Sequence, residues 1–425
     1  RDLVRSRGLG DVYKRQADDS VALNEINFPD ANFRAYLSEN VDTDGDGALS
    51  VEERDNHPII SVANRGITSL KGIEYFPNLK NLSCSKNPLD KLDVSTLTEL
   101  TSLTCMADGL SELNLYENNK LQRLNCANNQ LTSLVVLSDS LTKVDCYVNK
   151  LETLDLTSVP NLKSLRCDQN SLKSLDLSNN QSLTSINCTY NNLTSLDLSK
   201  NTSLANVTNA MIGNQSVSLK ANFDGNMIVI PFENSNLDND NYVSSTLDDY
   251  GDGSGFNFAS FIAYDVSEID GGIEYYCNTK LAGSENMKVS VTVSRDFHQV
   301  SFYADSENTS LIGRAFANDG QSVTAPEIKN SPQCKVLDTW SDTLDNVTGD
   351  KSIYANWKDA HSYSLSSFSN DTATVKCSAC GDTFTLSFID AVNSKKGDEK
   401  YSPYLDVTKD GVINAKDYAL LNKMK

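Results

Sequence analysis

Histidine is scarce in this chain of 425 residues, which contains only His57, His298 and His361. Because histidine is the most frequent general acid or base, this scarcity limits the options for histidine-based catalysis. Basic residues are also few, with 37 Lys and Arg against 57 Asp and Glu and a formal net charge of −20. Binding to a nucleic-acid backbone or an anionic membrane needs a basic surface, so neither partner is expected.

Long apolar runs are missing as well. No run of about 18 consecutive apolar residues is present, so no transmembrane segment is expected. Hydrophobic residues still make up 39 % of the chain, which is enough to bury real cores. The length corresponds to about two to four domains.

Residues 1–16 differ from the rest, because they are rich in Lys and Arg and lack the apolar centre of a signal peptide. This segment resembles the translated adapter scar at the ends of metagenomic gene models, which implies that it is non-native. A native basic tail is the alternative. The following Ala17-Asp18-Asp19 looks like the start of a mature secreted protein, so we expect a secreted or cell-surface location.

An internal repeat is the strongest signal and extends over residues 59–211. Its frame is L-x-x-L-x-C-x-x-N-x-L-x-x-L-x-L, and its cysteines follow at steps of 21, 21, 20, 21 and 21 residues: Cys84, Cys105, Cys126, Cys146, Cys167 and Cys188. A degenerate first copy is expected at Val62, Ile67, Leu70 and Ile73. The frame resembles a bacterial leucine-rich repeat, which implies a solenoid of parallel strands with a short or irregular convex side.

A single repeat cannot close its own core, so neighbouring repeats are expected to stack. The repeated asparagines are expected to form a hydrogen-bonded ladder: Asn87, Asn129, Asn149, Asn170 and Asn191. Asp108 stands in this column in the second copy and predicts a weaker rung. Stacked cysteines would have Cβ atoms about 4.8 Å apart, whereas a disulfide needs about 3.8 Å. The six thiols are therefore expected to be small buried hydrophobes.

The outward side chains of the strands are the candidates for ligand binding. Tyrosine and arginine are enriched at binding hot spots, and four such residues are candidates for a contact patch: Arg123, Tyr147, Arg166 and Tyr190. A merely solvated polar face is the alternative, and the pattern does not specify the ligand. The recurring Asp155, Asp176 and Asp197 are expected to cap turns on the opposite surface.

Residues 17–58 contain an EF-hand-like loop and are expected to form a helical cap. Residues 42–53 match the calcium-loop pattern, with Gly47 at the sharp turn, and the expected ligands are Asp42, Asp44, Asp46, the Ala48 carbonyl, Ser50 and Glu53. The alternation of oxygen donors suits a hard cation. We expect a structural role, because an unpaired loop beside a solenoid can cover its open end.

A second calcium loop lies in residues 388–425 and leads directly into a helix. Its expected ligands are Asp406, Thr408, Asp410, the Val412 carbonyl, Asn414 and Asp417. The segment resembles a dockerin half-repeat, which implies calcium-dependent docking to a cohesin, with Ala415 and Lys416 at the partner-selective positions. Thr408 departs from the usual Asn or Asp. The segment Asp390–Asp398 is at best a degenerate first loop.

The chain between the solenoid and this loop is expected to form small all-β modules. Residues 212–296 alternate polar and apolar side chains between turn clusters, which predicts a β-sandwich-like module. Residues 297–358 resemble the internalin-type B-repeat, a small β-grasp spacer, through the Trp340 and Val347-Thr-Gly-Asp…Trp357 pattern. Both tryptophans are expected to anchor its core.

Residues 359–387 contain a candidate zinc site. His361, Cys377 and Cys380 supply a histidine and a C-x-x-C pair, and Cys334 is the nearest remaining thiol. A local disulfide and free thiols are the alternatives.

The sequence favours a non-catalytic, secreted or cell-surface binding protein that uses calcium at one or two sites. Its solenoid face would recognise a protein or glycan, and its C-terminal module would dock to a cohesin or another surface partner. One alternative is a hydrolase, a glycosidase or protease with an unrecognised site in 212–296. Another is a purely structural surface spacer. Only the resemblance to dockerins implies a gut or rumen bacterium.

Overall fold

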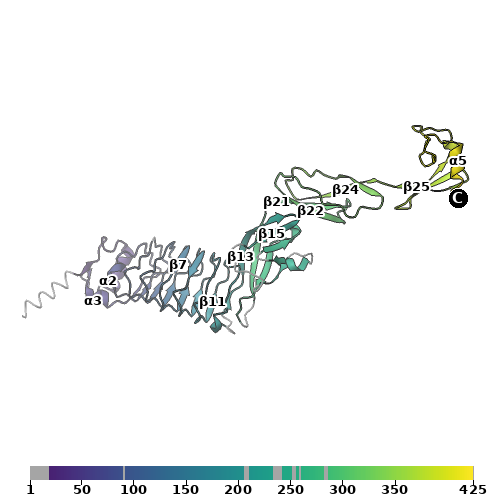
Figure 1. The fold of residues 1–425 in the computed structure, drawn as a ribbon. Helices are drawn as coiled ribbons and strands as arrows, with labels where there is room; N and C mark the ends of the chain where they lie inside the picture. The colour runs from purple at the N-terminus through teal and green to yellow at the C-terminus, as the bar shows by residue number, and fades with distance from the viewer. Residues whose placement is uncertain are drawn as a thin grey trace, which may run out of the picture. The chain divides into compact units, whose positions relative to one another are not determined.

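Figure 1 shows the computed structural model, which describes residues 19–89, 91–204, 210–232, 242–250, 255–257, 260–281 and 286–424. The chain divides into two compact units, Arg1–Arg295 and Asp296–Lys425. The expected scar at 1–16 lies outside the described residues.

The segment before the repeat contains two helices. The two-residue strands β1 (Val21–Ala22) and β2 (Ala48–Leu49) pair antiparallel, and α2 (Ala31–Asn40) and α3 (Val51–Asp55) flank the loop before β2. Asp30 caps α2 by accepting a hydrogen bond from the Phe33 amide. Helix α2 buries Phe33, Tyr36 and Leu37, whose spacing places them on one face.

The repeat forms a leucine-rich-repeat solenoid, and Figure 1 shows its short strands stacked one on the next. An eight-stranded parallel sheet contains, in spatial order, β12 (Ala210–Met211), β11 (Ser185–Asn187), β10 (Ser164–Arg166), β8 (Lys143–Asp145), β6 (Arg123–Asn125), β5 (Ser102–Thr104), β4 (Asn81–Ser83) and β3 (Ile59–Ser61). Strand β3 confirms the degenerate first copy. The pair β7 (Ser133–Val135) and β9 (Thr153–Asp155) and the 3-10 turns Ile73–Tyr75 and Thr202–Leu204 lie outside this sheet.

The interior of the solenoid consists of the repeated apolar residues. All six cysteines of the ladder are fully buried among the leucines, in agreement with their predicted role. Burial raises the pKa of Cys126 and of Cys188 to about 12, so these thiols stay protonated. Adjacent strands pair in register, as in Leu165 with Ile186, which keeps every leucine on the inner side.

The asparagine ladder is present and follows one pattern. In the Asn191 rung, Oδ1 accepts from the Leu172 amide at 3.0 Å, and Nδ2 donates to the carbonyls of Cys167 and Cys188 at 3.0 Å each. The amide of Gln215 continues the ladder by donating to the Cys188 carbonyl at 2.9 Å. The last turn of the solenoid therefore reaches Gln215, beyond the predicted boundary at residue 211.

Asp108 makes a different rung, because a carboxylate cannot donate to a carbonyl. Its Oδ1 accepts from the Asn87 amide at 2.8 Å, and its Oδ2 accepts from the Cys84 thiol at 3.6 Å. The residue is only 1 % exposed. Burial raises its pKa to about 6, against hydrogen bonds that lower it. The folded chain therefore binds the Asp108 proton more tightly than the unfolded chain does.

Replacing Asp108 with asparagine is expected to stabilise the solenoid by about 1–2 kcal/mol at pH 7.5. The raised pKa of Asp108 stabilises the folded chain fully below pH 3.8, the ordinary pKa of an aspartate. This stabilisation is lost as the pH rises through about 6. The gain should therefore shrink towards zero at pH 4.5, where wild-type Asp108 is protonated. Calorimetric unfolding of both chains at the two pH values tests this. An equal gain at both would contradict it.

Residues 215–294 contain two four-stranded sheets. One sheet contains, in order, β13 (Gln215–Lys220), β20 (Met287–Ser294), β19 (Ile273–Cys277) and β16 (Tyr242–Ser245), and the other β14 (Asn222–Asp224), β15 (Met227–Pro231), β18 (Ser260–Ala263) and β17 (Gly255–Asn257). Two 3-10 turns, Thr246–Tyr250 and Val266–Glu268, complete this module. The buried Tyr275 packs between Phe232 and Phe261. Its hydroxyl donates to the Thr194 carbonyl at 2.7 Å, which joins this module to the solenoid.

The second unit begins with a mixed sheet ordered β22 (Leu311–Asn318), β21 (Phe297–Tyr303), β24 (Lys351–Asp359) and β23 (Lys335–Trp340), in which β21 and β24 run parallel. Its core contains Val300, Phe302 and Ile353, and Trp340 packs edge-on against Phe302 at 5.0 Å. Trp357 was also expected to anchor this core; it is half-buried, and its Nε1 donates to the Ala304 carbonyl at 2.8 Å. It lies outside the core cluster to which Trp340 belongs.

The last module combines a three-stranded sheet with the C-terminal helices. Strands β25 (Tyr363–Ser369), β26 (Thr372–Cys377) and β27 (Thr383–Ser387) pair antiparallel and precede α4 (Phe388–Ala391) and α5 (Ala415–Leu421). One core joins sheet and helices: Phe368, Ala373, Phe388, Ala391, Leu405, Ile413 and Leu421. The predicted boundary at 387 is therefore not a boundary between cores. A lone calcium loop and helix offer too little apolar surface to close a core.

Candidate functional site

The N-terminal loop brings three of its expected calcium ligands together. One carboxylate oxygen from each of Asp42, Asp44 and Asp46 lies within 4.8 Å of the others. Gly47 takes the left-handed conformation (φ +81°) that the sharp turn requires. Asp42 is buried, and its two oxygens accept hydrogen bonds from the Gly45 and Gly47 amides.

Glu53, the expected last ligand of this loop, makes hydrogen bonds instead of joining that group. Its Oε1 accepts from the Thr43 amide at 2.6 Å, and its Oε2 accepts from the amide of Ser50 at 2.9 Å. Burial alone would raise the pKa of Glu53, but these hydrogen bonds lower it to about 2. Ser50 is the N-cap of α3, and Ala48 lies in β2. The Glu53 carboxylate is therefore ionised at neutral pH.

The C-terminal loop gathers the expected carboxylates Asp406, Asp410 and Asp417 within 4.8 Å. The Thr408 hydroxyl lies between two of them, at 2.8 Å from Asp417 Oδ1 and 3.3 Å from Asp406 Oδ1. Asn414 caps α5, and its Nδ2 donates to the Val412 carbonyl at 3.1 Å. Thr408 stands at position 3 of the loop, where Asn or Asp is usual, and it still offers a side-chain oxygen there.

The upstream segment, residues 390–398, hydrogen-bonds to this loop. Lys395 and Val412 form an antiparallel bridge, and the Asn393 amide donates to the Ile413 carbonyl at 2.7 Å. The segment expected to be a degenerate first loop therefore supports the second loop structurally. Both loops fit Ca²⁺ in their donor chemistry, because they offer hard oxygen ligands on a curled backbone.

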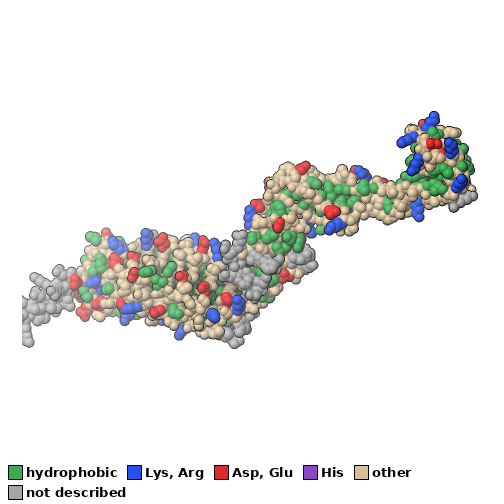
Figure 2. Space-filling view, viewed as in Figure 1, with side chains coloured by type: hydrophobic (Ala, Val, Ile, Leu, Met, Phe, Trp, Pro, Cys, Tyr) green, Lys and Arg blue, Asp and Glu red, His purple; other side chains and the backbone are tan. Residues whose placement is uncertain are grey.

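The predicted partner-docking residues lie at the start of α5. Ala415 and Lys416 are exposed. Large hydrophobic side chains are exposed in the same module: Ile389, Val392, Tyr418, Leu420 and Met424. Figure 2 shows hydrophobic side chains gathered over this C-terminal part of the chain. Such a concentration of exposed apolar groups is typical of an interaction surface.

Two of the four predicted ligand-binding residues meet on the strand face of the solenoid. The guanidinium of Arg166 lies 4.1 Å from the centre of the Tyr147 ring, in a cation–π contact. Arg123 is exposed in β6 and stands opposite Lys143 in the register. Tyr190 is 59 % exposed but has a left-handed backbone (φ 56°), in the turn that follows β11. It lies beyond the strand rather than on its face.

Two buried aspartates flank the Arg166–Tyr147 pair, and sequence reasoning did not select them. Asp145 and Asp168 are 7 % and 4 % exposed. Lys143 pairs with Asp145 Oδ2 at 2.9 Å, and Arg166 Nε lies 3.6 Å from Asp168 Oδ1. Among the described residues, neither Asp145 Oδ1 nor Asp168 Oδ1 has a hydrogen-bond partner. The strand face therefore combines an exposed cation and an aromatic ring beside two buried carboxylates.

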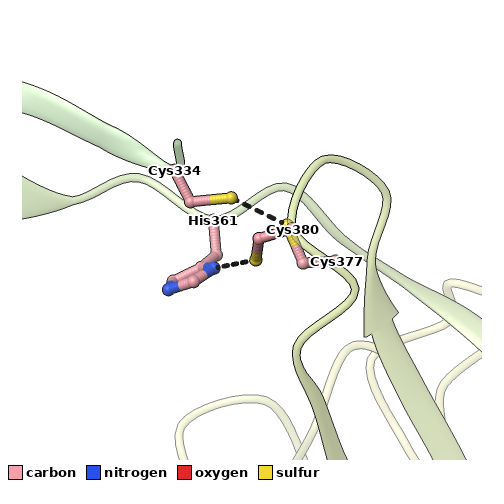
Figure 3. A group of neighbouring side chains, drawn as sticks. All are labelled: Cys334, His361, Cys377 and Cys380. Atoms are coloured by element: carbon pink, nitrogen blue, oxygen red, sulfur yellow. Dashed lines mark hydrogen bonds between the residues drawn. The ribbon is translucent and has the colours of Figure 1, made fainter. Parts of the chain in front are cut away.

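The three predicted zinc ligands meet a fourth residue, Cys334 (Figure 3). The Sγ atoms of Cys334 and Cys377 are 3.4 Å apart, and Cys380 Sγ lies 3.2 Å from His361 Nδ1. All four ligand atoms lie within 4.8 Å of one another. Backbone hydrogen bonds, first from Cys380, lower the pKa of Cys377 to about 5. The distances place a thiol-rich cluster here, without a bonded sulfur pair.

The turns of the solenoid contain a regularity that the sequence did not reveal. One residue in each turn is left-handed, two positions after the cysteine column: Asn64, Lys86, Ala107, Asn128, Val148, Gln169, Tyr190 and Asn214. No glycine stands there, so the usual signal for this conformation is missing. The aspartates expected to cap turns do so, as Asp155 accepts from the Thr157 amide at 3.0 Å.

Comparison with protein-family models and with curated proteins gave no match. Among solved structures, the functional domain of InlJ from Listeria monocytogenes, which includes a cysteine ladder, is similar over 65 % of this chain and 99 % of that one, at 17 % identity and TM-score 0.29.

An internalin C2 from the same organism matches 47 % of this chain and 88 % of its own, at 21 % identity and TM-score 0.40. InlP from L. monocytogenes matches 64 % and 99 %, at 17 % identity and TM-score 0.34. Because these TM-scores are below 0.5, the solenoid assignment rests on the register of the chain's own strands. Within the described residues, no helix has the length and apolarity needed to cross a membrane.

Proposed function

We propose that this chain is a non-catalytic, secreted or cell-surface binding protein. The strand face of its solenoid would recognise a protein or a glycan. Its C-terminal calcium module would dock to a cohesin or another surface partner. The modules between them would act as spacers.

The Arg166–Tyr147 pair with its buried aspartates is the observation that carries this proposal. The Tyr147 ring packs against the Arg166 guanidinium and holds it in place before a partner binds. This preorganisation lowers the entropic cost of binding. Arg166 still keeps 44 % of its side chain exposed. A preorganised arginine on an aromatic ring resembles the anchors that dominate protein interfaces. The buried carboxylate of Asp168, with Oδ1 3.6 Å from Arg166 Nε, also helps to hold the guanidinium in this position.

The surface of α4 and α5 supports the docking part of the proposal. Calcium would hold the loop before α5, and the helix displays Ala415 and Lys416 beside exposed Tyr418 and Leu420. A helix that presents apolar side chains around one basic residue, here Lys416, suits a groove on a protein partner. The partner would then bind only when calcium orders the loop.

Replacing Arg166 with alanine is expected to weaken ligand binding by the solenoid about 30-fold, the effect of a hot-spot residue of roughly 2 kcal/mol. The matched control is Lys173→Ala, because Lys173 is 76 % exposed and pairs with the exposed Glu152 at 3.3 Å. Binding of both full-length variants to a glycan array and to extracellular proteins would be quantified by biolayer interferometry.

Two outcomes would contradict the proposal. Equal loss of binding in the Arg166 and Lys173 variants would indicate a nonspecific charge effect. Turnover of peptide or polysaccharide substrates by the full chain would indicate a hydrolase, for which residues 212–296 remain the candidate region.

A further inference from the structure

We propose that Cys334, His361, Cys377 and Cys380 bind one zinc ion, and that this ion ties the β21–β24 sheet to the β25–β27 sheet. The inference is independent of the ligand-binding function proposed above. Cys334 directly precedes β23, His361 lies between β24 and β25, Cys377 ends β26, and Cys380 lies in the turn before β27. The four donors thus come from separate stretches that folding brings together.

The separations between the donors suit a tetrahedral metal site. Zinc–sulfur bonds of about 2.3 Å place two ligands of a tetrahedron about 3.8 Å apart. The observed separations are 3.4 Å for the Cys334 and Cys377 sulfurs and 3.2 Å for Cys380 Sγ and His361 Nδ1. A disulfide needs about 2.05 Å between its sulfurs. The pocket is therefore close to the size of a Cys₃His site and too wide for a bonded sulfur pair.

The donor set selects the metal. Three thiols and one imidazole are soft or borderline ligands, which favour zinc over the hard cations calcium and magnesium. Four protein ligands fill a tetrahedron and leave no position for a substrate, so the site would be structural. The oxygen-rich loops at Asp42 and Asp406 have the opposite preference. The ligand types therefore favour zinc at this cluster and calcium at the two loops.

The residues around the cluster orient its ligands. The ring of His361 stacks on Tyr363 at 4.9 Å, with 24° between the planes, and the Tyr363 hydroxyl donates to Asp382 at 2.6 Å. The Nδ1 of His361 faces Cys380, while its Nε2 lies 3.9 Å from Asp359. A carboxylate beyond the outer nitrogen is the usual second partner of a metal-bound histidine.

The C-x-x-C turn has the geometry of a metal knuckle. Gly381 follows the second cysteine in the left-handed conformation (φ +77°), and its amide donates to the Cys377 carbonyl at 3.0 Å. The Cys377 amide donates to the Asp382 carbonyl at 2.8 Å, which closes the turn. Both sulfurs of the turn are thereby aimed at the space that Cys334 and His361 enter.

The position of Cys334 gives the ion a role between two sheets. The chain passes from β24 to β25 through residues 360–362 alone. A zinc ion bound to Cys334 on one side and to the C-x-x-C turn on the other would connect the two sheets a second time, through metal–ligand bonds. Small modules with little core commonly depend on such a metal. The two sheets would then move as one body in the zinc-loaded chain.

The test uses the full chain, purified under reducing conditions, loaded with zinc and dialysed. We expect one zinc per chain, and tetrahedral thiolate bands in the visible spectrum when cobalt(II) replaces zinc. Cys334→Ser and His361→Gln should weaken zinc binding by more than the roughly 10- to 100-fold cost of losing an outer partner. Ser378→Ala and His298→Gln are the matched controls and should bind as wild type.

Hydrogen exchange measures the tie between the sheets. Deuterium uptake at residues 359–363 should rise when a zinc-selective chelator is added, and should be high in Cys334→Ser without it. Unchanged uptake would overturn the tie between the sheets. A reduced chain that takes up no zinc, or Cys334→Ser with unchanged zinc affinity, would overturn the site. A Cys334–Cys377 disulfide that persists in the zinc-loaded chain purified under reducing conditions would overturn both.

Discussion

Replacing Asn191 with alanine is expected to lower the free energy of unfolding of the solenoid by about 2–4 kcal/mol. The residue is 2 % exposed, and its amide holds two strands of the ladder together. The variant leaves the Leu172 amide, now bonded at 3.0 Å, without its acceptor in the interior. It also removes one donor from the carbonyls of Cys167 and Cys188.

Asn179→Ala is the matched control, because the exposed Asn179 makes a single hydrogen bond of 3.5 Å to the Thr157 carbonyl. Its unfolding should change by less than about 0.5 kcal/mol, as for most surface substitutions. Urea unfolding of the full chain, followed by circular dichroism in the range of the solenoid transition, measures both. Similar stabilities for the two variants would show that the ladder does not stabilise the stack.

Calcium is expected to stabilise the second unit by about 4 kcal/mol when its free concentration is about 1,000 times the dissociation constant. Asp406→Ala should abolish this increment, because Asp406 belongs to the carboxylate group and is 3 % exposed. The loop continues into Ile413 and Leu421 of the shared core. Binding at the loop therefore reports on the stability of the whole C-terminal module.

Calorimetry of the full chain with calcium, or after calcium removal with zinc restored, measures this increment. Glu399→Ala, which changes an exposed acid outside the carboxylate group and outside residues 390–398, should keep it. Asp42→Ala should leave the increment of the second unit intact and affect only the first unit. An increment that survives Asp406→Ala would place the stabilising calcium elsewhere.

The features that the sequence predicted correctly are those with a fixed local spacing. The cysteine and leucine columns repeat about every 21 residues, so the inner and outer positions of each strand follow from the frame alone. The alternating acids of each loop also lie together, Asp42 with Asp44 and Asp46, and Asp406 with Asp410 and Asp417. Calcium binding at either loop stays a prediction. Each of these patterns is complete within one short stretch of chain, which is why it can be seen without a structure.

The features that were missed depend on contacts between distant stretches. Cys334 was named from the sequence only as the nearest remaining thiol, because it lies 43 residues before Cys377 and only the folding of β23 to β26 brings it to the C-x-x-C turn. The shared core of residues 359–387 and 388–425 has the same origin, since Phe368 and Leu421 meet only after folding. Gln215 was missed because it continues the asparagine ladder with a different residue type. Tyr190 was placed on the face because a left-handed turn without glycine has no sequence signal.

The two-ended binding proposed for this chain is tested most directly by capturing partners from bacterial surface extracts and a cohesin panel on the immobilised full chain. The account predicts two separable sets of partners. One set would require calcium and be lost with Asp406→Ala but kept with Arg166→Ala, and the other would show the reverse. Capture that neither variant nor calcium removal changes would contradict it.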